Sequence, residues 1–297
     1  MVFTGRIPYQ ALVDRPRLVL PDNARLAVWV IVNVEEWSID RAMPRMVLPP
    51  PMGTPLLPDV PNWSWHEYGM RAGFWRQYEA LTARGIRTTL AINGSACQSY
   101  SRVASAAHDA SWEFMGHGFL QGPMHKLDDQ DGAIRKTIEA IARFTGRAPR
   151  SWESPGLTET EVTLDLLRKN GIENVADWVI DDLPQDVATK HGTITLLPYT
   201  VELNDVVMFA VQQHESDQFL KRGMAQFDRL YKEGAANARI MAISIHPYLT
   251  GVAHRIRYLE ELLDYILGHR DVITLTASEV GSWYRREMAR VAAGPVS

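Results

Sequence analysis

Short apolar runs that end in polar residues alternate along this chain with stretches of helical periodicity. Runs this short, bounded by turn residues, are typical of buried strands. They are 26–32, 88–92, 112–115, 150–153, 239–245 and 272–275, with another beginning at Val175. About seven such strand–helix units follow one another without a linker, and this alternation predicts a parallel sheet covered by helices. We therefore expect one α/β domain over residues 1–297, a distorted (β/α)7 barrel with 1–24 as an irregular N-terminal arm.

Three of the remaining segments carry more specific expectations. Residues 66–84 have a helical apolar stripe closed by Gly85, which predicts one continuous helix. Residues 43–61 are rich in proline and should form a long loop at the carboxyl end of the first strand. Residues 193–211 contain two short strand-like pieces, which predict a hairpin over the site.

The composition narrows the class of partner. Charged residues make up 22% of the chain, the net charge is −4 and the isoelectric point is near 6.1, so no nucleic-acid surface is expected. No apolar run approaches the ~20 residues that span a bilayer. The segment after Met1 lacks the basic start and apolar core of a signal peptide, so we expect a cytoplasmic protein that binds no membrane. The single cysteine, Cys97, excludes an internal disulfide.

Polar side chains follow several of the predicted strands at the point where each strand ends. Because the carboxyl ends of parallel strands meet at one face of a barrel, we expect these side chains to lie close together. They are Asn33, Glu35, Glu36, Asn93, His117, Glu153, Ser154, Asp181, Asp182 and His246. Carboxylates and imidazoles without a Lys or Arg cluster indicate hydrolysis of a neutral substrate rather than phosphoryl transfer.

The order of these residues resembles the polysaccharide deacetylase superfamily, whose fold is a distorted barrel. Further motifs are similar to its allantoinase branch, which opens cyclic ureides instead of removing acetyl groups from sugars. These motifs are Asn33-Val34-Glu35-Glu36, 67–76, Asp181-Asp182-Leu183-Pro184, 198–205 and Ile245-His246. The resemblance covers nearly the whole chain from Arg25 to Tyr284. It implies a hydrolase that acts on carbon–nitrogen bonds other than peptide bonds.

Two positions depart from the family patterns. Gln121 stands where deacetylases carry a second histidine, four residues after His117, and His125 is the available substitute. At the fourth strand end the allantoinase branch has an Arg, whereas this chain has Glu153. These departures imply a substrate other than allantoin itself. A relative in this group hydrolyses cyclic imides with a divalent metal, and that activity accommodates the additional Glu and His.

Ring opening needs an activated water and a proton for the departing nitrogen. We expect Glu35 to be the base, with its proton affinity raised by Glu36 unless a cation lies between them. His246 is the expected acid, because imidazole titrates near neutral pH. In the alternative assignment Glu35 positions the substrate and Glu153 is the base.

A metal and a small pocket complete the predicted site. Glu36, His117 and His125 are the expected ligands of Zn²⁺ or a similar divalent ion, and a metal-free mechanism is the alternative. The expected substrate-binding residues are Asn33, Trp37, Trp152, Ser154, Asp181 and Tyr199.

The predicted function is therefore a hydrolase, as a homo-oligomer, that opens the ring of a small cyclic amide, imide or ureide. The pocket for such a ring should be small and largely apolar, with few polar groups. Two alternatives stay open at this point. One is an N-deacetylase acting on an acetylated sugar or another amide, and the other is a catalytically inactive relative that binds a heterocycle.

Overall fold

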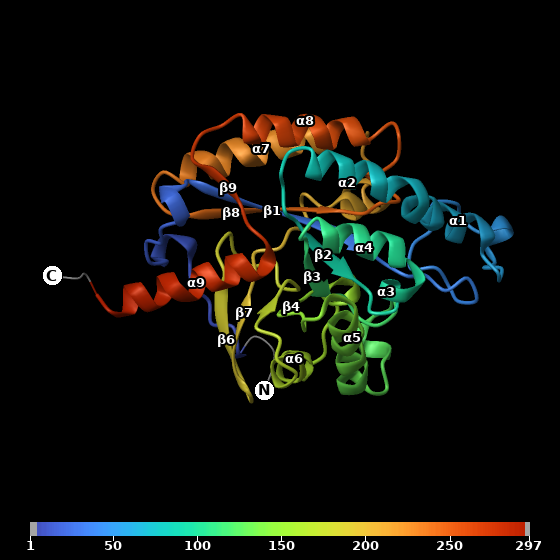
Figure 1. Ribbon diagram of the computed structural model, residues 1–297, viewed down its shortest axis with the longest axis horizontal. Helices are drawn as coiled ribbons and strands as arrows, with labels where there is room; N and C mark the ends of the chain where they lie inside the picture. Colours follow the sequence, from blue (N-terminus) through green and yellow to red (C-terminus); the bar gives the residue numbers. More distant parts are fainter. Residues whose placement is uncertain (1–4, 295–297) are drawn as a thin grey trace.

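The computed structural model of the chain describes residues 5–294 and shows one sheet surrounded by helices (Figure 1). Across the sheet the strand order is β6-β7-β5-β4-β3-β2-β1-β8, and β9 pairs with the first residues of β1. All pairs are parallel except β6 with β7. The strands are β1 (Leu26–Val34), β2 (Thr89–Ile92), β3 (Glu113–Gly116), β4 (Ser151–Trp152), β5 (Asn174–Val175), β6 (Gln185–Thr189), β7 (Gly192–Leu196), β8 (Arg239–Ile245) and β9 (Val272–Thr274). This topology confirms the predicted distorted α/β barrel.

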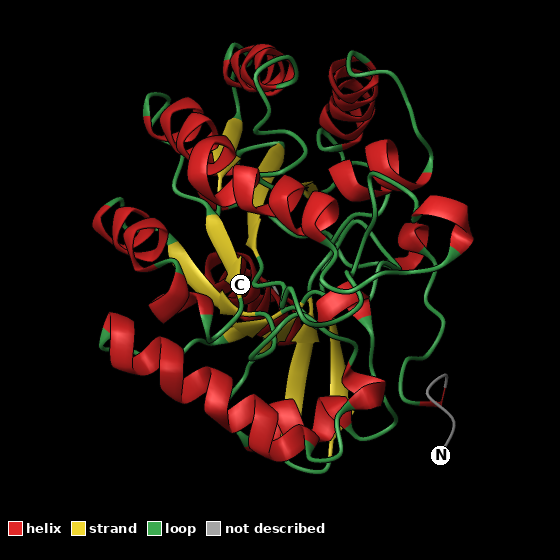
Figure 2. Ribbon diagram, turned by 90° about the vertical axis from the view of Figure 1, so that its right-hand side faces the viewer, coloured by secondary structure: helices red, strands yellow, loops and turns green. Residues whose placement is uncertain are grey.

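The helices form a ring around the strands, which Figure 2 shows with the strands enclosed at the centre. In Figure 1, α2, α7 and α8 cover one side of the sheet, and α5 and α6 lie on the opposite side. The helices are α1 (Val60–Tyr68), α2 (Phe74–Thr82), α3 (Ala96–Ser99), α4 (Ser101–Asp109), α5 (Gln130–Thr145), α6 (Thr163–Lys169), α7 (Gln218–Glu233), α8 (Ile256–Leu267) and α9 (Ala277–Ala292).

Strand β1 is buried along its whole length, and its side chains alternate between two apolar clusters. The valines at even positions from Val28 to Val34 pack outward with helices α2, α4, α7 and α8. Ala27, Trp29 and Ile31 face the barrel interior. Because side chains alternate with a period of two, the next inward positions are Asn33 and Glu35, at the carboxyl end of the strand. The strand period thus places both side chains in the site.

Strand β8 repeats this arrangement beside β1. Ile240 and Ala242 face the interior, whereas Met241, Ile243 and Ile245 pack outward. The next inward positions are Ser244 and His246, so β8 delivers its polar residues to the same face of the barrel as β1.

The barrel is open between β8 and the β6–β7 hairpin, and irregular segments border β8 there. The carbonyl of Asp182 accepts a hydrogen bond from the Ile240 N–H at 3.2 Å, and the carbonyl of Leu203 accepts one from the Ser244 N–H at 3.1 Å. These bonds satisfy backbone groups on an edge that has no neighbouring strand. They also bring the segment 198–205 next to the carboxyl end of β8.

Two local expectations need adjustment. The predicted helix over 66–84 is present, begins earlier at Val60 and ends at Thr82, but it contains a wider π-helical turn at Gly69–Gly73 between α1 and α2. The predicted hairpin over 193–211 is instead formed by β6 and β7, and Val206–Val211 form a second π-helical turn. Apolar periodicity alone does not separate a short strand from a buried helical turn, which explains the second error.

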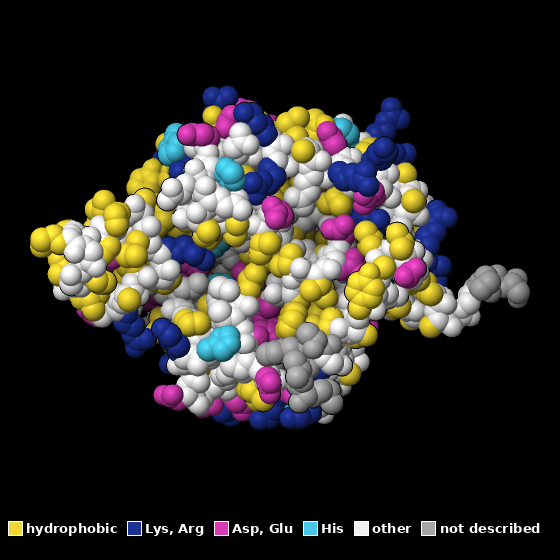
Figure 3. Space-filling model, turned by 180° about the vertical axis from the view of Figure 1, so that it is seen from behind, with side chains coloured by type: hydrophobic (Ala, Val, Ile, Leu, Met, Phe, Trp, Pro, Cys, Tyr) yellow, Lys and Arg dark blue, Asp and Glu magenta, His cyan; other side chains and the backbone are white. Residues whose placement is uncertain are grey.

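The proline-rich segment before α1 projects from the end of the molecule toward which β1 runs (Figure 1). Asn62 anchors it, because its side-chain oxygen accepts hydrogen bonds from the N–H groups of Val47 and Leu48. Figure 3 shows hydrophobic side chains on this projection. Those exposed in this segment include Met46, Val47, Leu48, Met52, Leu56 and Leu57. None of the helices within 5–294 is long and apolar enough to cross a membrane.

Candidate active site

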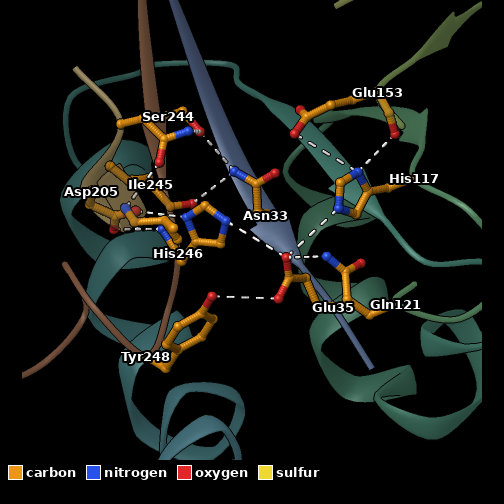
Figure 4. A network of polar contacts seen from close by, with 12 residues as sticks. Asn33, Glu35, His117, Gln121, Glu153, Asp205, Ser244, Ile245, His246 and Tyr248 are labelled. Carbon is orange, nitrogen blue, oxygen red and sulfur yellow. Dashed lines mark hydrogen bonds and ion pairs between the residues drawn. The ribbon is translucent and has the colours of Figure 1, made fainter. Parts of the chain in front are cut away.

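Glu35 lies at the centre of the strand-end site (Figure 4). Its carboxylate accepts hydrogen bonds from Trp37 Nε1 at 2.7 Å, from Gln121 Nε2 at 2.7 Å and from the Tyr248 hydroxyl at 3.5 Å. Three donors around one buried carboxylate favour its charged form. The chain therefore holds Glu35 as an oriented anion.

Two imidazoles from different strand ends face this anion. Nε2 of His117, after β3, and Nε2 of His246, after β8, each lie 3.8 Å from Oε1 of Glu35. Burial raises the pKa of Glu35, but the contacts with the two histidines outweigh burial and lower the pKa to about 2. The expectation of a raised proton affinity is wrong. Glu36 has no such effect because, one residue on, it faces another way and accepts a hydrogen bond from the Ser99 hydroxyl at 2.8 Å.

Asp205 fixes the orientation of His246. The Nδ1–H of His246 donates to Oδ1 of Asp205 at 2.6 Å, and the backbone N–H of His246 donates to Oδ2 at 2.7 Å. The Thr250 hydroxyl also donates to Oδ2, at 2.6 Å. Asp205 is completely buried. With its proton on Nδ1 fixed by a carboxylate, the ring presents Nε2 to the site, as in the acid–base pairs of hydrolases.

Glu153, which follows β4, is the second buried carboxyl group of the site. Its Oε1 accepts a hydrogen bond from the Tyr199 hydroxyl at 3.1 Å. Burial raises the pKa of Glu153 to about 7, although the charge of His117 opposes this rise. A carboxyl group with that pKa is partly ionised at neutral pH and can both take up and release a proton.

His117 lies between the two carboxyl groups. Its Nδ1–H donates to the backbone carbonyl of Glu153 at 2.8 Å, and Nδ1 is 3.9 Å from Oε1 of the same residue. Burial opposes the charge of His117, but Glu35 and Glu153 outweigh burial and raise its pKa. The two carboxyl groups that enclose His117 thus favour its protonated form.

A hydrogen-bonded chain connects β1 to Glu153. Asn33 Nδ2 donates to Ser244 Oγ at 3.0 Å, Ser244 Oγ lies 2.6 Å from the Tyr199 hydroxyl, and Tyr199 donates to Glu153. Within 5–294, Asn33 Oδ1, His117 Nε2 and Glu153 Oε2 are buried and have no hydrogen-bond partner. Buried polar atoms are normally paired, so these three atoms are the groups to which a small polar ligand would bind.

Several predicted residues lie outside this cluster. Trp152 is completely buried in the outer core beneath α5 and α6, because it neighbours the inward-facing Glu153 in the chain and therefore faces the other way. Ser154 accepts a hydrogen bond from Trp152 Nε1 at 3.0 Å. Asp181 forms an ion pair with Arg15 at 3.3 Å. Together with Tyr199, Asp181 lines a separate cavity of about 620 Å³ at the open seam of the barrel.

The predicted metal ligands do not converge. The structure places His125 at the surface, in a short turn over Met124–Lys126, and Glu36 faces Ser99 rather than His117. Among the described residues, no group of three or more His, Cys, Asp or Glu side chains could hold a metal ion. The side chains present therefore do not fit the expected Zn²⁺ site. Gln121, at the position of the missing histidine, instead donates to Glu35.

Sequence reasoning assigned no role to several residues that shape the site. His66 Nε2 lies 3.0 Å from the backbone carbonyl of Glu35, and its ring stacks on Trp37 with centroids 4.5 Å apart. Tyr248 and Asp205 contact Glu35 and His246 respectively. Asp205 could have been identified from its place in the motif 198–205. No feature of the sequence indicates a role for His66, which is a single histidine within a helix.

The open barrel, with carboxyl and imidazole groups at its strand ends, and part of the sequence resemble known proteins. Residues 65–175 match the family model described as polysaccharide deacetylase. Together with the fold, this match makes the chain similar to the polysaccharide deacetylase superfamily. Hydrolases of carbon–nitrogen bonds other than peptide bonds occur in this superfamily.

The similar proteins include both polysaccharide deacetylases and an allantoinase. A Schizosaccharomyces pombe protein described as a polysaccharide deacetylase is 27% identical over 88% of this chain and 90% of its own length. A solved structure from Pseudomonas aeruginosa with the same description has a TM-score of 0.83 at 26% identity, covering 92% of this chain and 95% of that one. The solved structure of PuuE allantoinase also has a TM-score of 0.83, at 25% identity, covering 92% and 94%. The chain is thus equally similar in fold to both kinds of protein.

Proposed function

We propose that this protein is a hydrolase that opens the ring of a small cyclic amide, imide or ureide. The observation that carries this proposal is the enclosure of the acid–base residues. Glu35, His117, Glu153 and His246 are only 5%, 2%, 3% and 6% exposed. A sugar polymer needs an open groove, whereas a small ring can be surrounded by such a site.

Glu153 is the general base in this proposal. Its raised pKa and its unpartnered Oε2 suit removal of a proton from water at neutral pH. The oxygen of that water attacks the ring carbonyl carbon, and the water proton passes to Glu153. This replaces the first assignment, in which Glu35 was the base, because a carboxylate with a pKa of about 2 is a poor proton acceptor.

His246 is the general acid. As the carbon–nitrogen bond breaks, Nε2 of His246 delivers a proton to the departing ring nitrogen, while Asp205 holds the imidazole in place. His117 Nε2 donates a hydrogen bond to the carbonyl oxygen as negative charge develops there. Glu35 keeps both imidazoles oriented toward the substrate, and Asn33 Oδ1 accepts a ring N–H.

A substrate panel tests this function. Purified protein is incubated with succinimide, hydantoin, dihydrouracil, allantoin and N-acetylated chitooligosaccharides, with Glu153→Gln as a matched inactive control. Ring opening of one or more cyclic compounds, followed by liquid chromatography, is the expected result. Turnover of the oligosaccharides alone would overturn the proposal in favour of a sugar N-deacetylase. Thermal stabilisation by a cyclic compound without ring opening would indicate an inactive binding protein.

The same assay tests whether turnover requires a divalent metal ion. Because the predicted ligands do not converge, turnover of the cyclic substrate is expected to persist after dialysis against a chelator. Elemental analysis of the dialysed protein provides the control for complete removal. Loss of turnover that Zn²⁺ restores would contradict the metal-free proposal.

A further inference from the structure

Two more carboxyl groups, those of Asp177 and Glu159, lie next to the turn that contains Glu153. Asp177 follows β5, is 9% exposed, and its Oδ1 accepts a hydrogen bond from the backbone N–H of Ser154 at 2.6 Å. Glu159 follows the same turn, and its Oε1 accepts one from Trp178 Nε1 at 2.9 Å. Asp177 therefore holds the peptide group immediately after Glu153.

The second oxygens of the two carboxyl groups lack a donor. Asp177 Oδ2 and Glu159 Oε2 are both buried and have no hydrogen-bond partner within residues 5–294. The two side chains are also within hydrogen-bonding contact of each other. Two ionised carboxylates in buried contact would repel strongly, whereas a single proton between them satisfies both oxygens.

The charged groups around the pair do not replace that proton. Arg6 faces Glu159, but its guanidinium forms two hydrogen bonds to Asp165, at 3.1 and 2.9 Å. His117 faces Asp177 and is held between Glu35 and Glu153. Glu153 also lies near Asp177 and adds negative charge when it is ionised. These surroundings therefore favour a protonated form of the carboxyl pair.

We propose that Asp177 and Glu159 share one proton at neutral pH, and that this pair positions the Glu153–Ser154 turn while limiting the negative charge beside Glu153. Burial, reinforced by Asp177, raises the pKa of Glu159 to about 10, in agreement with this arrangement. The positioning role rests on the proposed function of Glu153 as base. The shared proton does not depend on that function.

Proton release on unfolding tests the shared proton without any substrate. A carboxyl group exposed by unfolding ionises near pH 4.5, so the pair gives up its proton when the protein unfolds at pH 7.5. We expect Glu159→Gln to release about one proton fewer than the wild type, measured in weakly buffered urea with an indicator dye. Glu161→Gln is the control, because it makes the same change at an exposed position two residues away and should release the wild-type number.

Equal proton release from the wild type and Glu159→Gln would overturn the proposal that Asp177 and Glu159 share a proton. If Glu159→Gln does not fold, Asp177→Asn gives the same comparison, since its amide oxygen still accepts the Ser154 N–H. A wild-type protein that opens no ring on the substrate panel would overturn the proposed function alone, because proton release is measured without substrate.

The positioning role has its own test in the turnover assay. Asp177→Ala removes the acceptor for the Ser154 N–H, whereas Asp177→Asn retains one. A misplaced catalytic group lowers the rate of the chemical step, so we expect kcat of the Ala variant to be about tenfold below that of the Asn variant, with similar KM. Equal kcat values for the two folded variants would overturn the positioning role.

Discussion

The carboxyl groups of Glu35 and Glu153 lie on either side of one imidazole, and their pKa values are displaced in opposite directions. Oε1 of Glu35 is 3.8 Å from Nε2 of His117, and Oε1 of Glu153 is 3.9 Å from Nδ1. His117, His246 and the Trp37 N–H outweigh burial and lower the pKa of Glu35 to about 2, whereas burial raises that of Glu153 to about 7. Because of this difference in pKa, Glu35 remains ionised at neutral pH, whereas Glu153 can take up and release a proton there.

The first prediction concerns Glu153→Gln, which keeps the shape of the side chain but removes the base. We expect kcat for ring opening to fall by about 10²–10⁴-fold with little change in KM, as is typical for loss of a general base. Steady-state kinetics measure this, with Glu161→Gln as the control. The wild-type kcat/KM should decline below about pH 7, where Glu153 becomes protonated. A Glu153→Gln enzyme within threefold of the wild type would assign the base elsewhere.

The second prediction concerns stability in acid. Because the pKa of Glu35 falls from 4.5 to about 2 on folding, Glu35 stabilises the fold fully above pH 4.5. That contribution, about 3 kcal/mol from about 2.5 pH units, is lost as pH falls from 4.5 toward 2. Urea unfolding of Glu35→Gln should therefore show a smaller loss of stability over this range than the wild type.

Glu36→Gln provides the matched control for that measurement. It makes the same change one residue away, and its amide can still accept the hydrogen bond from Ser99. We expect it to follow the wild-type acid dependence. Parallel curves for the wild type and Glu35→Gln would refute the assignment of Glu35 as a buried anion.

The third prediction concerns Asp205→Asn. The substitution preserves size but replaces the carboxylate that accepts the Nδ1–H of His246. A misoriented or wrongly protonated imidazole is a poor general acid, so we expect kcat to fall by about 10²–10⁴-fold. Circular dichroism and a melting curve establish that the variant folds. Unchanged kcat in a folded variant would remove His246 from the proton transfer.

The fourth prediction concerns the π-helical turn between α1 and α2. A Cβ at Gly73 would overlap the carbonyl oxygen of Pro247, in the turn that follows His246. Because backbone cannot yield as a flexible side chain does, Gly73→Ala should destabilise the protein by about 1–3 kcal/mol. Denaturant unfolding measures the change. Gly122→Ala, where nothing lies within 4 Å of the new methyl group, should have a much smaller effect.

The sequence by itself determined the alternation of strands and helices and the chemical character of the strand ends. The apolar run that ends in Asn33 and Glu35 is a local signal, and the period of two in a strand sends both side chains to one face. The same period separates Glu36 from Glu35 and Trp152 from Glu153, since neighbouring residues of a strand point to opposite faces. Local periodicity suffices for such assignments because it depends only on residues close in the chain.

Only the tertiary structure decided which carboxyl group has a raised pKa and which histidine has a carboxylate partner. Asp205 meets His246 from a segment 41 residues away, along an open barrel edge that no strand pattern indicated. The pKa of Glu153 depends on its burial in the packed barrel and on the charges of His117, Asp177 and His246, which follow other strands. Because desolvation and Coulomb interactions act through space, the ionisation of these groups follows from the packed barrel and not from the order of residues along the chain.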